Sequence, residues 1–348
     1  MPNGGQPTIV SIAARAGVSI ASVSRVLNGQ GARRDTVERV RRAAAELGYV
    51  PNAVARSLKD GRTRQLTFAM PDIGNPVYVA MVRAIQAVTK AAGYRLLLHS
   101  TDAVAEDELA VLHSLGDRTS DGLILCPIRI TDEHIEALTT AAGPVVVIGS
   151  LPDGVPVDSV RADSVAGSAM AVAHLFRTGR RRIAFINGPS DTVPGHNRDL
   201  GYRTALTACG LPHDEALVVH TDFGIDSGAA AVRRLLPARP DALFCANDQL
   251  ALGAAHALLA RGVRIPEDIA VAGMDDSALA QAGWPPLTSV DLGSSTRGRR
   301  AAELLLDRLE TRGGTGTAPP PRTSTAPPRL VVRASTAPTT DSPITRTA

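Results

Sequence analysis

Short apolar runs alternate with amphipathic segments of roughly ten to fifteen residues between residues 65 and 273 of this 348-residue chain. The runs predict strands at 65–70, 95–99, 122–126, 145–148, 182–186, 217–220, 242–245 and 270–273. The segments between them predict helices at 79–92, 106–115, 132–142, 165–178, 198–209, 227–236 and 250–261. Such alternation is typical of parallel, doubly wound sheets. Because the series runs twice, we expect two subdomains that face each other across a cleft.

The remaining C-terminal sequence is less regular. Residues 296–312 predict one more helix, and 313–328, rich in Gly, Pro, Thr and Ser, predict a loop. Residues 330–333 are expected to form a last strand that returns to the second subdomain, and 337–348 a disordered tail. A chain of this length exceeds one typical domain, so two or three units are expected.

Residues 8–28 have the pattern of two short helices joined by a tight turn. The apolar residues of the first helix recur with helical spacing, at Ile9, Ile12, Ala13 and Ala16. Thr8 can cap its start, Gly17 can end it in the left-handed conformation, and Ser19 can cap the second helix. The second helix is expected to bury Val23, Val26 and Leu27.

The other side of the second helix is small and polar around one arginine, and consists of Ile20, Ala21, Ser24, Arg25 and Asn28. A helix that exposes such a face fits the major groove of DNA and can hydrogen-bond base edges, which favours a helix-turn-helix. Ordinary helix packing in a globular protein is the alternative. Charge favours DNA, since residues 1–64 hold eleven Arg and Lys against four Asp and Glu. Their net charge of +7 leaves −4 for the rest of a chain with a net charge of +3.

A third helix is expected from Arg34 to Leu47, ended by Gly48, which completes a small three-helix head. In the following segment, 49–61, Asn52 is a good N-cap, but 53–58 is barely long enough for two helical turns. A helix this short is marginal alone in water. The segment is either a plain linker or a hinge that becomes helical when DNA and a partner subunit stabilise it.

Several classes of protein are disfavoured. Cys126, Cys209 and Cys245 lack CxxC spacing, which indicates reduced thiols in a cytoplasmic protein. The N-terminus lacks the pattern of a signal peptide, and no apolar run reaches the length of a membrane span. Dinucleotide, P-loop, nucleophile-elbow and zinc-protease motifs are absent, and the eight histidines show no ligand spacing. We therefore expect no catalytic residue, metal or cofactor.

Six ordered motifs make the chain resemble the LacI/GalR family of bacterial transcription regulators. They lie at 16–28, 46–58, 71–76, 246–253, 265–276 and 285–290, and the fourth reads Ala-Asn-Asp-Gln-Leu-Ala-Leu-Gly. The resemblance implies a ligand-responsive regulator, most often a repressor, which binds a pseudo-palindromic operator as a homodimer or higher oligomer.

The resemblance also implies the fold class and domain boundaries. The expected fold is an all-α helix-turn-helix head followed by an α/β effector domain of two periplasmic-binding-protein-like subdomains with doubly wound parallel sheets. The head would span 1–48, the hinge 49–61, and the effector-binding and dimerisation domain 62–336. Within that domain, the N-subdomain would comprise 62–161 and 293–325, and the C-subdomain 162–292 and 326–336.

In the family's pattern, the first two positions of the recognition helix and its arginine read bases, and here these are Ile20, Ala21 and Arg25. Arg25 can fork onto guanine O6 and N7, whereas the other two offer only apolar contact. The residues expected to bond phosphates are Ser19, Ser22, Ser24 and Asn28. In the hinge, DNA contacts are expected from Asn52, Ala55 and Leu58. Leu58 would be a wedge that opens the central base step, or else a linker residue packed on the effector domain.

Ligands of doubly wound sheets bind beyond the carboxyl ends of the strands, so residues just after predicted strands are candidate effector contacts. Their position suggests eight contacts, and the resemblance implies all of these except Asn75. The eight are Asn75, Val77, Tyr78, Asp163, Arg198, Phe223, Asn247 and Asp275. Arg198 is expected at a helix start, where a cation gains nothing from the helix dipole, so ligand contact explains it better. Asn247 and Asp248 can both cap the next helix, and Asp248 is the better candidate for that role.

These side chains favour a sugar or sugar derivative as effector, although a nucleoside or other polar metabolite acting as co-repressor would use many of the same groups. An extracytoplasmic solute-binding protein would share the cleft, but it would need a signal peptide and would lack the basic head. The chain departs from the family's pattern at Arg33, where a Ser commonly caps the third helix, and at Val37, where an Arg commonly contacts phosphate. Leu292 replaces a common Gln near the crossover between subdomains.

Overall fold

The computed structural model describes residues 7–50, 57, 61–311 and 319–337. The chain divides into two compact units, 1–63 and 64–348, which we describe separately. Of the helices in the described residues, none is by itself long and apolar enough to cross a membrane. Helices α1 and α2 meet that test only when taken together, and a bend of 108° separates them.

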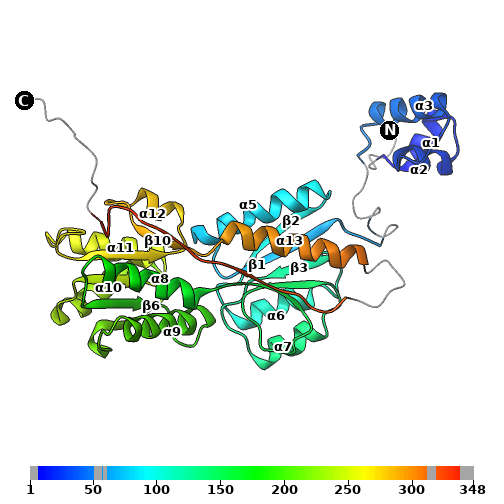
Figure 1. Ribbon diagram of the computed structural model, residues 1–348. Coiled ribbons are helices and arrows are strands. Elements are labelled where there is room, and N and C mark those ends of the chain that lie inside the picture. Colours follow the sequence, from blue (N-terminus) through cyan, green and yellow to red (C-terminus); the bar gives the residue numbers. More distant parts are fainter. Residues whose placement is uncertain (1–6, 51–56, 58–60, 312–318, 338–348) are drawn as a thin grey trace, which may run out of the picture. The chain divides into compact units, whose positions relative to one another are not determined.

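The first unit is a three-helix head with α1 at Ile9–Ala16, α2 at Ile20–Leu27 and α3 at Arg34–Glu46 (Figure 1). Thr8 caps α1, Gly17 ends it with φ of 61°, and Ser19 caps α2, as the sequence predicts. Arg33 precedes α3 and makes no side-chain cap bond. Because Arg33 stands in place of the usual Ser, α3 lacks the hydrogen bond with which an N-cap side chain stabilises the start of a helix.

Helix α3 holds the two helices of the turn in place. Ile12, Val23 and Val40, one from each helix, are fully buried together. The Arg39 guanidinium donates to the carbonyls of Ala16 and Gly17 at 3.0 Å, which satisfies acceptors that the end of α1 leaves free. The angle between α1 and α2 is thus fixed by a packed core and by a side-chain cap from α3.

The second unit contains two six-stranded sheets. The first sheet, in the order β11-β5-β4-β3-β1-β2, is entirely parallel. Its strands are β1 Gln65–Met70, β2 Arg95–Ser100, β3 Gly122–Leu125, β4 Val145–Ile148, β5 Asp158–Ala162 and β11 Thr323–Ala326. Its helices are α5 Pro76–Ala91 and α13 Ser294–Thr311 on one face, and α6 Ala105–His113 and α7 Asp132–Thr139 on the other.

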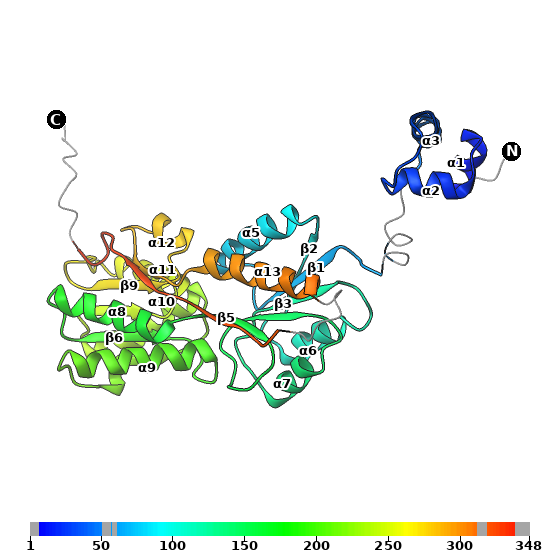
Figure 2. The same ribbon diagram turned by 45° about the vertical axis from the view of Figure 1, so that its right-hand side comes forward.

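The second sheet has the order β12-β10-β9-β8-β6-β7, in which only β12 is antiparallel. Its strands are β6 Ile183–Asn187, β7 Val218–His220, β8 Ala242–Cys245, β9 Ala270–Met274, β10 Thr288–Asp291 and β12 Arg329–Val331. Its helices are α8 Ser164–Arg177, α9 Val193–Ala208, α10 Ile225–Leu235, α11 Asp248–Leu259 and the short α12 Ala278–Ala282. The pairs α8–α9 and α10–α11 pack on opposite faces (Figure 2).

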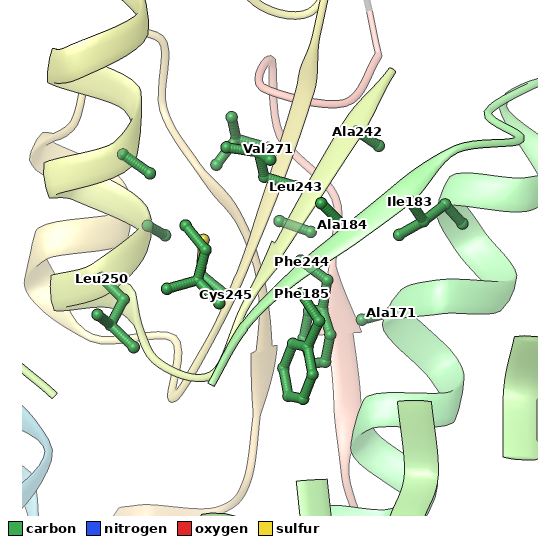
Figure 3. Packing of buried hydrophobic residues seen from close by; sticks show 14 of the residues in the cluster. Ala171, Ile183, Ala184, Phe185, Ala242, Leu243, Phe244, Cys245, Leu250 and Val271 are labelled. Carbon is green, nitrogen blue, oxygen red and sulfur yellow. The ribbon is translucent and has the colours of Figure 1, made fainter. Parts of the chain in front are cut away.

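The central strands of the second sheet are buried on both faces, as their continuous apolar runs predict. In Figure 3, Phe185 and Phe244 point toward Ala171 of α8, while Cys245 points the other way, toward Leu250 of α11. The two phenylalanine rings stack with centroids 4.9 Å apart. The sheet is therefore a rigid support for the loops at its carboxyl edge.

Three strands were not predicted. β5, β10 and β11 contain many Ser, Thr and charged residues, so they lack the apolar run that marks the other strands. The expectation of a loop over 313–328 is wrong at 323–326, where β11 forms the edge of the first sheet. The predicted return of the chain to the second subdomain is confirmed by β12, and its antiparallel pairing corrects the expectation of a purely parallel sheet.

The two subdomains of this unit are joined by three chain crossings. They follow β5, β10 and β11, which lead into α8, α13 and β12 respectively (Figure 2). Each subdomain is thus built from separate stretches of sequence, and the crossings lie close together between the two subdomains.

The buried carboxylate of Asp158 ties three elements of the first subdomain together. Both of its oxygens accept hydrogen bonds from the Arg308 guanidinium, at 2.8 and 2.6 Å. Arg322 adds bonds from its backbone N–H at 2.7 Å and from its guanidinium at 3.0 Å. Burial raises the pKa of Asp158, but the hydrogen bonds from the two arginines outweigh it, so the pKa lies below its ordinary value. β5, α13 and the start of β11 are therefore joined by one ionised group.

Candidate functional site

The exposed face of α2 is the candidate DNA-binding surface. Ile20, Ala21 and Arg25 are exposed on it, while Val23 and Val26 of the same helix are buried. Ile20 is 46% accessible, so its apolar side chain can contact a thymine methyl group. The helix thus presents one long polar side chain, Arg25, between small ones.

The predicted phosphate contacts of α2 already bond one another. The Ser19 and Ser22 hydroxyls lie 2.9 Å apart, and the Asn28 amide donates to Ser24 Oγ at 3.2 Å. These bonds orient the hydroxyl oxygens at both ends of the helix. The predicted hinge contacts Asn52, Ala55 and Leu58 lie outside the described residues.

The candidate effector site is a cavity of about 500 Å³ between the two subdomains. Seven of the eight predicted contacts line it, namely Asn75, Val77, Tyr78, Arg198, Phe223, Asn247 and Asp275. The structure does not bring Asp163 to this wall, because its carboxylate caps α8 by accepting from the N–H of Ala166 at 2.9 Å. Its neighbours Ala162 and Ser164 line the cavity instead.

Arg198 and Asp275 form the polar centre of the cavity. The guanidinium of Arg198 lies 3.6 Å from the carboxylate of Asp275 and 5.7 Å from the ring centre of Phe223. Burial lowers the pKa of Arg198, whereas it raises the pKa of Asp275. Arg198 Nε is buried without an acceptor in the described part of the chain. A ligand with hydroxyl or anionic oxygens would supply the missing acceptor.

The expected helix start at Arg198 is wrong. α9 begins five residues earlier, at Val193, because Thr192 caps it and Pro194 fits its first turn. Arg198 therefore lies in the second turn of α9.

The expected cap of α11 is also wrong. Asn247, not Asp248, is the N-cap, and its Oδ1 accepts from the N–H of Leu250 at 2.8 Å. Its Nδ2 donates to the carbonyl of Phe223 at 3.0 Å, which fixes another wall residue. Asn247 thus has a structural role in addition to its place in the cavity.

Asp248 holds the turn that carries Asp275. Its two oxygens accept from Ser289 Oγ at 2.6 Å and from the N–H of Ser277 at 2.7 Å. Ser289 Oγ in turn accepts from the N–H of Asp276 at 3.0 Å. Asp275 and Asp276 have φ of 100° and 46°, which is strained for residues other than glycine. Asp248 therefore stabilises the conformation that places Asp275 in the cavity.

The pH dependence of stability should reveal Asp248. Burial, together with the nearby charge of Asp275, raises its pKa to about 7, well above about 3.9 for an unfolded chain. A raised pKa contributes stability that is fully present below pH 4 and is lost as the pH rises through 7. The free energy of unfolding should therefore fall by on the order of 2 kcal/mol between pH 5 and pH 8. Urea unfolding at both pH values should show this loss in the wild type and not in Asp248→Asn. Equal pH dependence in the two proteins would contradict the assignment.

Some wall residues were missed by sequence reasoning. Arg297, the fourth residue of α13, is the most informative, and Asn197, Gln249 and Leu292 also line the cavity. The argument that singled out Arg198, a cation near a helix N-terminus, applies equally to Arg297. The sequence does not point to Arg297 because β10 lacks the apolar run that predicts a strand, so nothing indicates that the start of α13 lies at the carboxyl edge of a sheet.

The two subdomains also touch at the rim of the cavity. Arg129 of the first subdomain donates from Nε and Nη2 to the two carboxylate oxygens of Asp191 in the second, at 2.8 and 3.2 Å. The N–H of Val193 donates to the carbonyl of Ile128 at 2.8 Å. In the described residues, no group of three or more His, Cys, Asp or Glu side chains could hold a metal ion.

Comparison with known proteins identifies the family. Residues 8–52 match the model of bacterial regulatory proteins of the lacI family, and residues 172–336 match that of the periplasmic binding protein-like domain. The HTH-type transcriptional regulator CelR of Thermobifida fusca is 39% identical over 315 residues, which cover 87% of this chain and 92% of CelR. The chain belongs to the lacI family.

Solved structures of lacI-family proteins have the same fold. The CelR–cellobiose complex has a TM-score of 0.71 at 36% identity and covers 94% of this chain and 99% of its own. The lac repressor dimer bound to operator and the anti-inducer ONPF has a TM-score of 0.83 at 27% identity and covers 95% and 99%. The family and fold class predicted from the sequence are therefore confirmed. Like its lacI-family relatives, the chain is a DNA-binding transcriptional regulator and not an enzyme.

Proposed function

We propose that this chain is a cytoplasmic repressor that binds a pseudo-palindromic operator as a dimer and responds to a small sugar in the cleft. The observation that carries the proposal is the cavity, where Arg198 and Asp275 lie beside the Phe223 ring. Polar groups that bond hydroxyls, next to an aromatic face that covers C–H groups, suit a pyranose ring. The similarity to the CelR–cellobiose complex supports a sugar as the effector.

The proposed mechanism follows from the three chain crossings. A ligand that contacts both walls of the cavity stabilises one relative orientation of the subdomains, and so shifts the population of the dimer between two forms. One form lets the hinge residues Asn52, Ala55 and Leu58 fold against the minor groove, and the other does not. The base-reading residues of α2 are the same in both.

Effector binding tests the proposal directly. Thermal unfolding of the full chain should shift upward with at least one of glucose, cellobiose, gluconate and glucose 6-phosphate, and the same compound should change operator affinity. Adenosine and guanine serve as nucleoside and purine controls. A response only to these two would show that the effector is a purine compound and not a sugar. If no compound of the panel changes the unfolding temperature or the operator affinity, none of them is the effector.

Arg25→Ala should weaken operator binding by roughly 1–3 kcal/mol and relax the preference at one base pair per half-site. The operator is first selected with wild-type protein from a random double-stranded library, and affinity is then measured by fluorescence anisotropy. Arg233→Ala removes the same charge from the exposed surface of α10 and should leave both affinity and preference unchanged. If Arg25→Ala selects the same sequence with the same affinity, Arg25 does not read a base.

A further inference from the structure

The cavity contains a second buried arginine for which the protein provides no counter-ion. Arg297 is 8% exposed and lines the cavity together with Arg198, which is 7% exposed. Its Nε donates to the carbonyl of Leu292 at 3.1 Å. In the described residues, no carboxylate lies within 4.0 Å of its guanidinium. The remaining N–H groups of Arg297 therefore have neither a protein acceptor nor a paired charge.

The buried charges of the cavity do not balance. Asp275 is the one buried carboxylate among the described wall residues, and it faces both Arg198 and Arg297, each of which lowers its pKa against the larger effect of burial. Among the buried side chains that line the cavity, two cations thus face one carboxylate. Asp248 lies behind this wall and keeps part of its proton near pH 7, because burial raises its pKa to about 7. A charge that is mostly buried loses part of its hydration, so an anionic oxygen of a ligand would stabilise it.

Three further carboxylates lie at the exposed mouth of the cavity and do not correct this imbalance. Asp72 and Asp222 each accept a backbone N–H of their own turns, from Gly74 at 2.7 Å and from Gly224 at 2.8 Å. Asp102 accepts from Ser100 Oγ at 3.2 Å. Since all three are solvent-exposed, water and salt screen their charges from the interior.

We infer that the effector is an anionic sugar derivative and that its carboxylate or phosphate group binds Arg297. The inference rests on the proposed function, since it specifies the ligand of the same cleft. The bond from Nε to Leu292 fixes the plane of the guanidinium, and a planar guanidinium with free N–H groups matches two oxygens of a carboxylate or phosphate. Arg198 and Asp275 then bond the hydroxyls of the sugar body.

The test compares anionic sugars with their neutral parents at constant ionic strength. Full-length protein is titrated calorimetrically with glucose, gluconate, glucuronate and glucose 6-phosphate, and with cellobiose and cellobionate. We expect at least one anion to bind tenfold or more tightly than its neutral parent. Tighter binding of gluconate, cellobionate or glucuronate would identify the bound group as a carboxylate. Tighter binding of glucose 6-phosphate would identify it as a phosphate.

Variants at position 297 show whether this residue is responsible. Arg297→Leu should abolish the tenfold preference, because the anion and its neutral parent then meet the same uncharged wall. Arg297→Lys keeps the charge but not the planar fork, so it should retain part of the preference. If Arg297→Leu does not fold, the preference for the anion is tested with Arg297→Lys alone.

Each remaining outcome overturns a defined part of the argument. A neutral sugar that binds as tightly as its anions, with no effect of Arg297→Leu or Arg297→Lys on the ratio, overturns the anionic ligand and leaves a regulator of neutral sugars. Binding of neither class, in a protein that still binds its selected operator, overturns both the anionic ligand and the proposed sugar response.

Discussion

Asp158→Ala is expected to lower the free energy of unfolding of the effector unit by about 3 kcal/mol, because it leaves two arginines without their buried counter-ion. The side chain of Asp158 is fully buried, whereas those of Arg308 and Arg322 are 16% and 35% exposed, so water recovers part of the loss. Urea unfolding followed by far-UV circular dichroism measures the change. Asp307→Ala is the matched control, since Asp307 pairs with the same Arg322 at 3.0 Å on the surface, and should cost less than about 1 kcal/mol.

The pH dependence has a definite sign. A depressed carboxyl pKa contributes stability above the unfolded value of about 3.9 that is lost as the pH falls below it. The difference in free energy of unfolding between the wild type and Asp158→Ala should therefore shrink as the pH is lowered from about 4 to 2. A difference between the two proteins that stays constant over this range would show that the effect of Asp158 is not ionic.

Arg198→Met should weaken binding of the tightest panel ligand by roughly 100-fold and leave operator affinity without ligand unchanged. The substitution removes a cation from the centre of the cavity. It should also raise the pKa of Asp275 further, because the charge of Arg198 is the largest effect that lowers this pKa. Calorimetry on the ligand and anisotropy on the operator measure the two effects separately. In cells, this variant should regulate its target genes to the same extent whether or not the effector is present.

Arg203→Met is the control on the same helix. Arg203 pairs with Asp199 at 2.6 Å and Glu215 at 3.2 Å, away from the cavity wall, and its loss should not affect ligand binding. If the ligand affinity of Arg198→Met lies within threefold of the wild type, Arg198 does not bind the ligand.

The sequence was sufficient for elements whose stability is local. Strands 65–70, 145–148 and 242–245 were predicted with the observed bounds because they are mostly apolar and lie between two helical layers. The helix caps Thr8 and Ser19 were also predicted, since a cap bonds residues three positions away. Seven cavity residues followed from their places after strands and from the family's motifs.

The missed features depend on partners far away in the sequence. β5 carries a buried Asp158 that is tolerated only because Arg308 and Arg322 reach it from about 150 residues later, so local polarity concealed a central strand. Asp248 looked like a helix cap because its distant partners, Ser277 and Ser289, could not be seen. The buried charge of Arg297 likewise emerges only when α13 is placed beside the cleft.

The last two strands of the chain determine the order in which the protein can be completed during synthesis. Neither sheet has all its strands until the ribosome has passed residues 326 and 331, whereas α3, the last helix of the head, ends at Glu46. Because folding proceeds from the N-terminus as the chain emerges, the DNA-reading unit matures first and its control unit last. A transcript truncated before residue 323 would therefore encode a head with no complete effector domain to govern it.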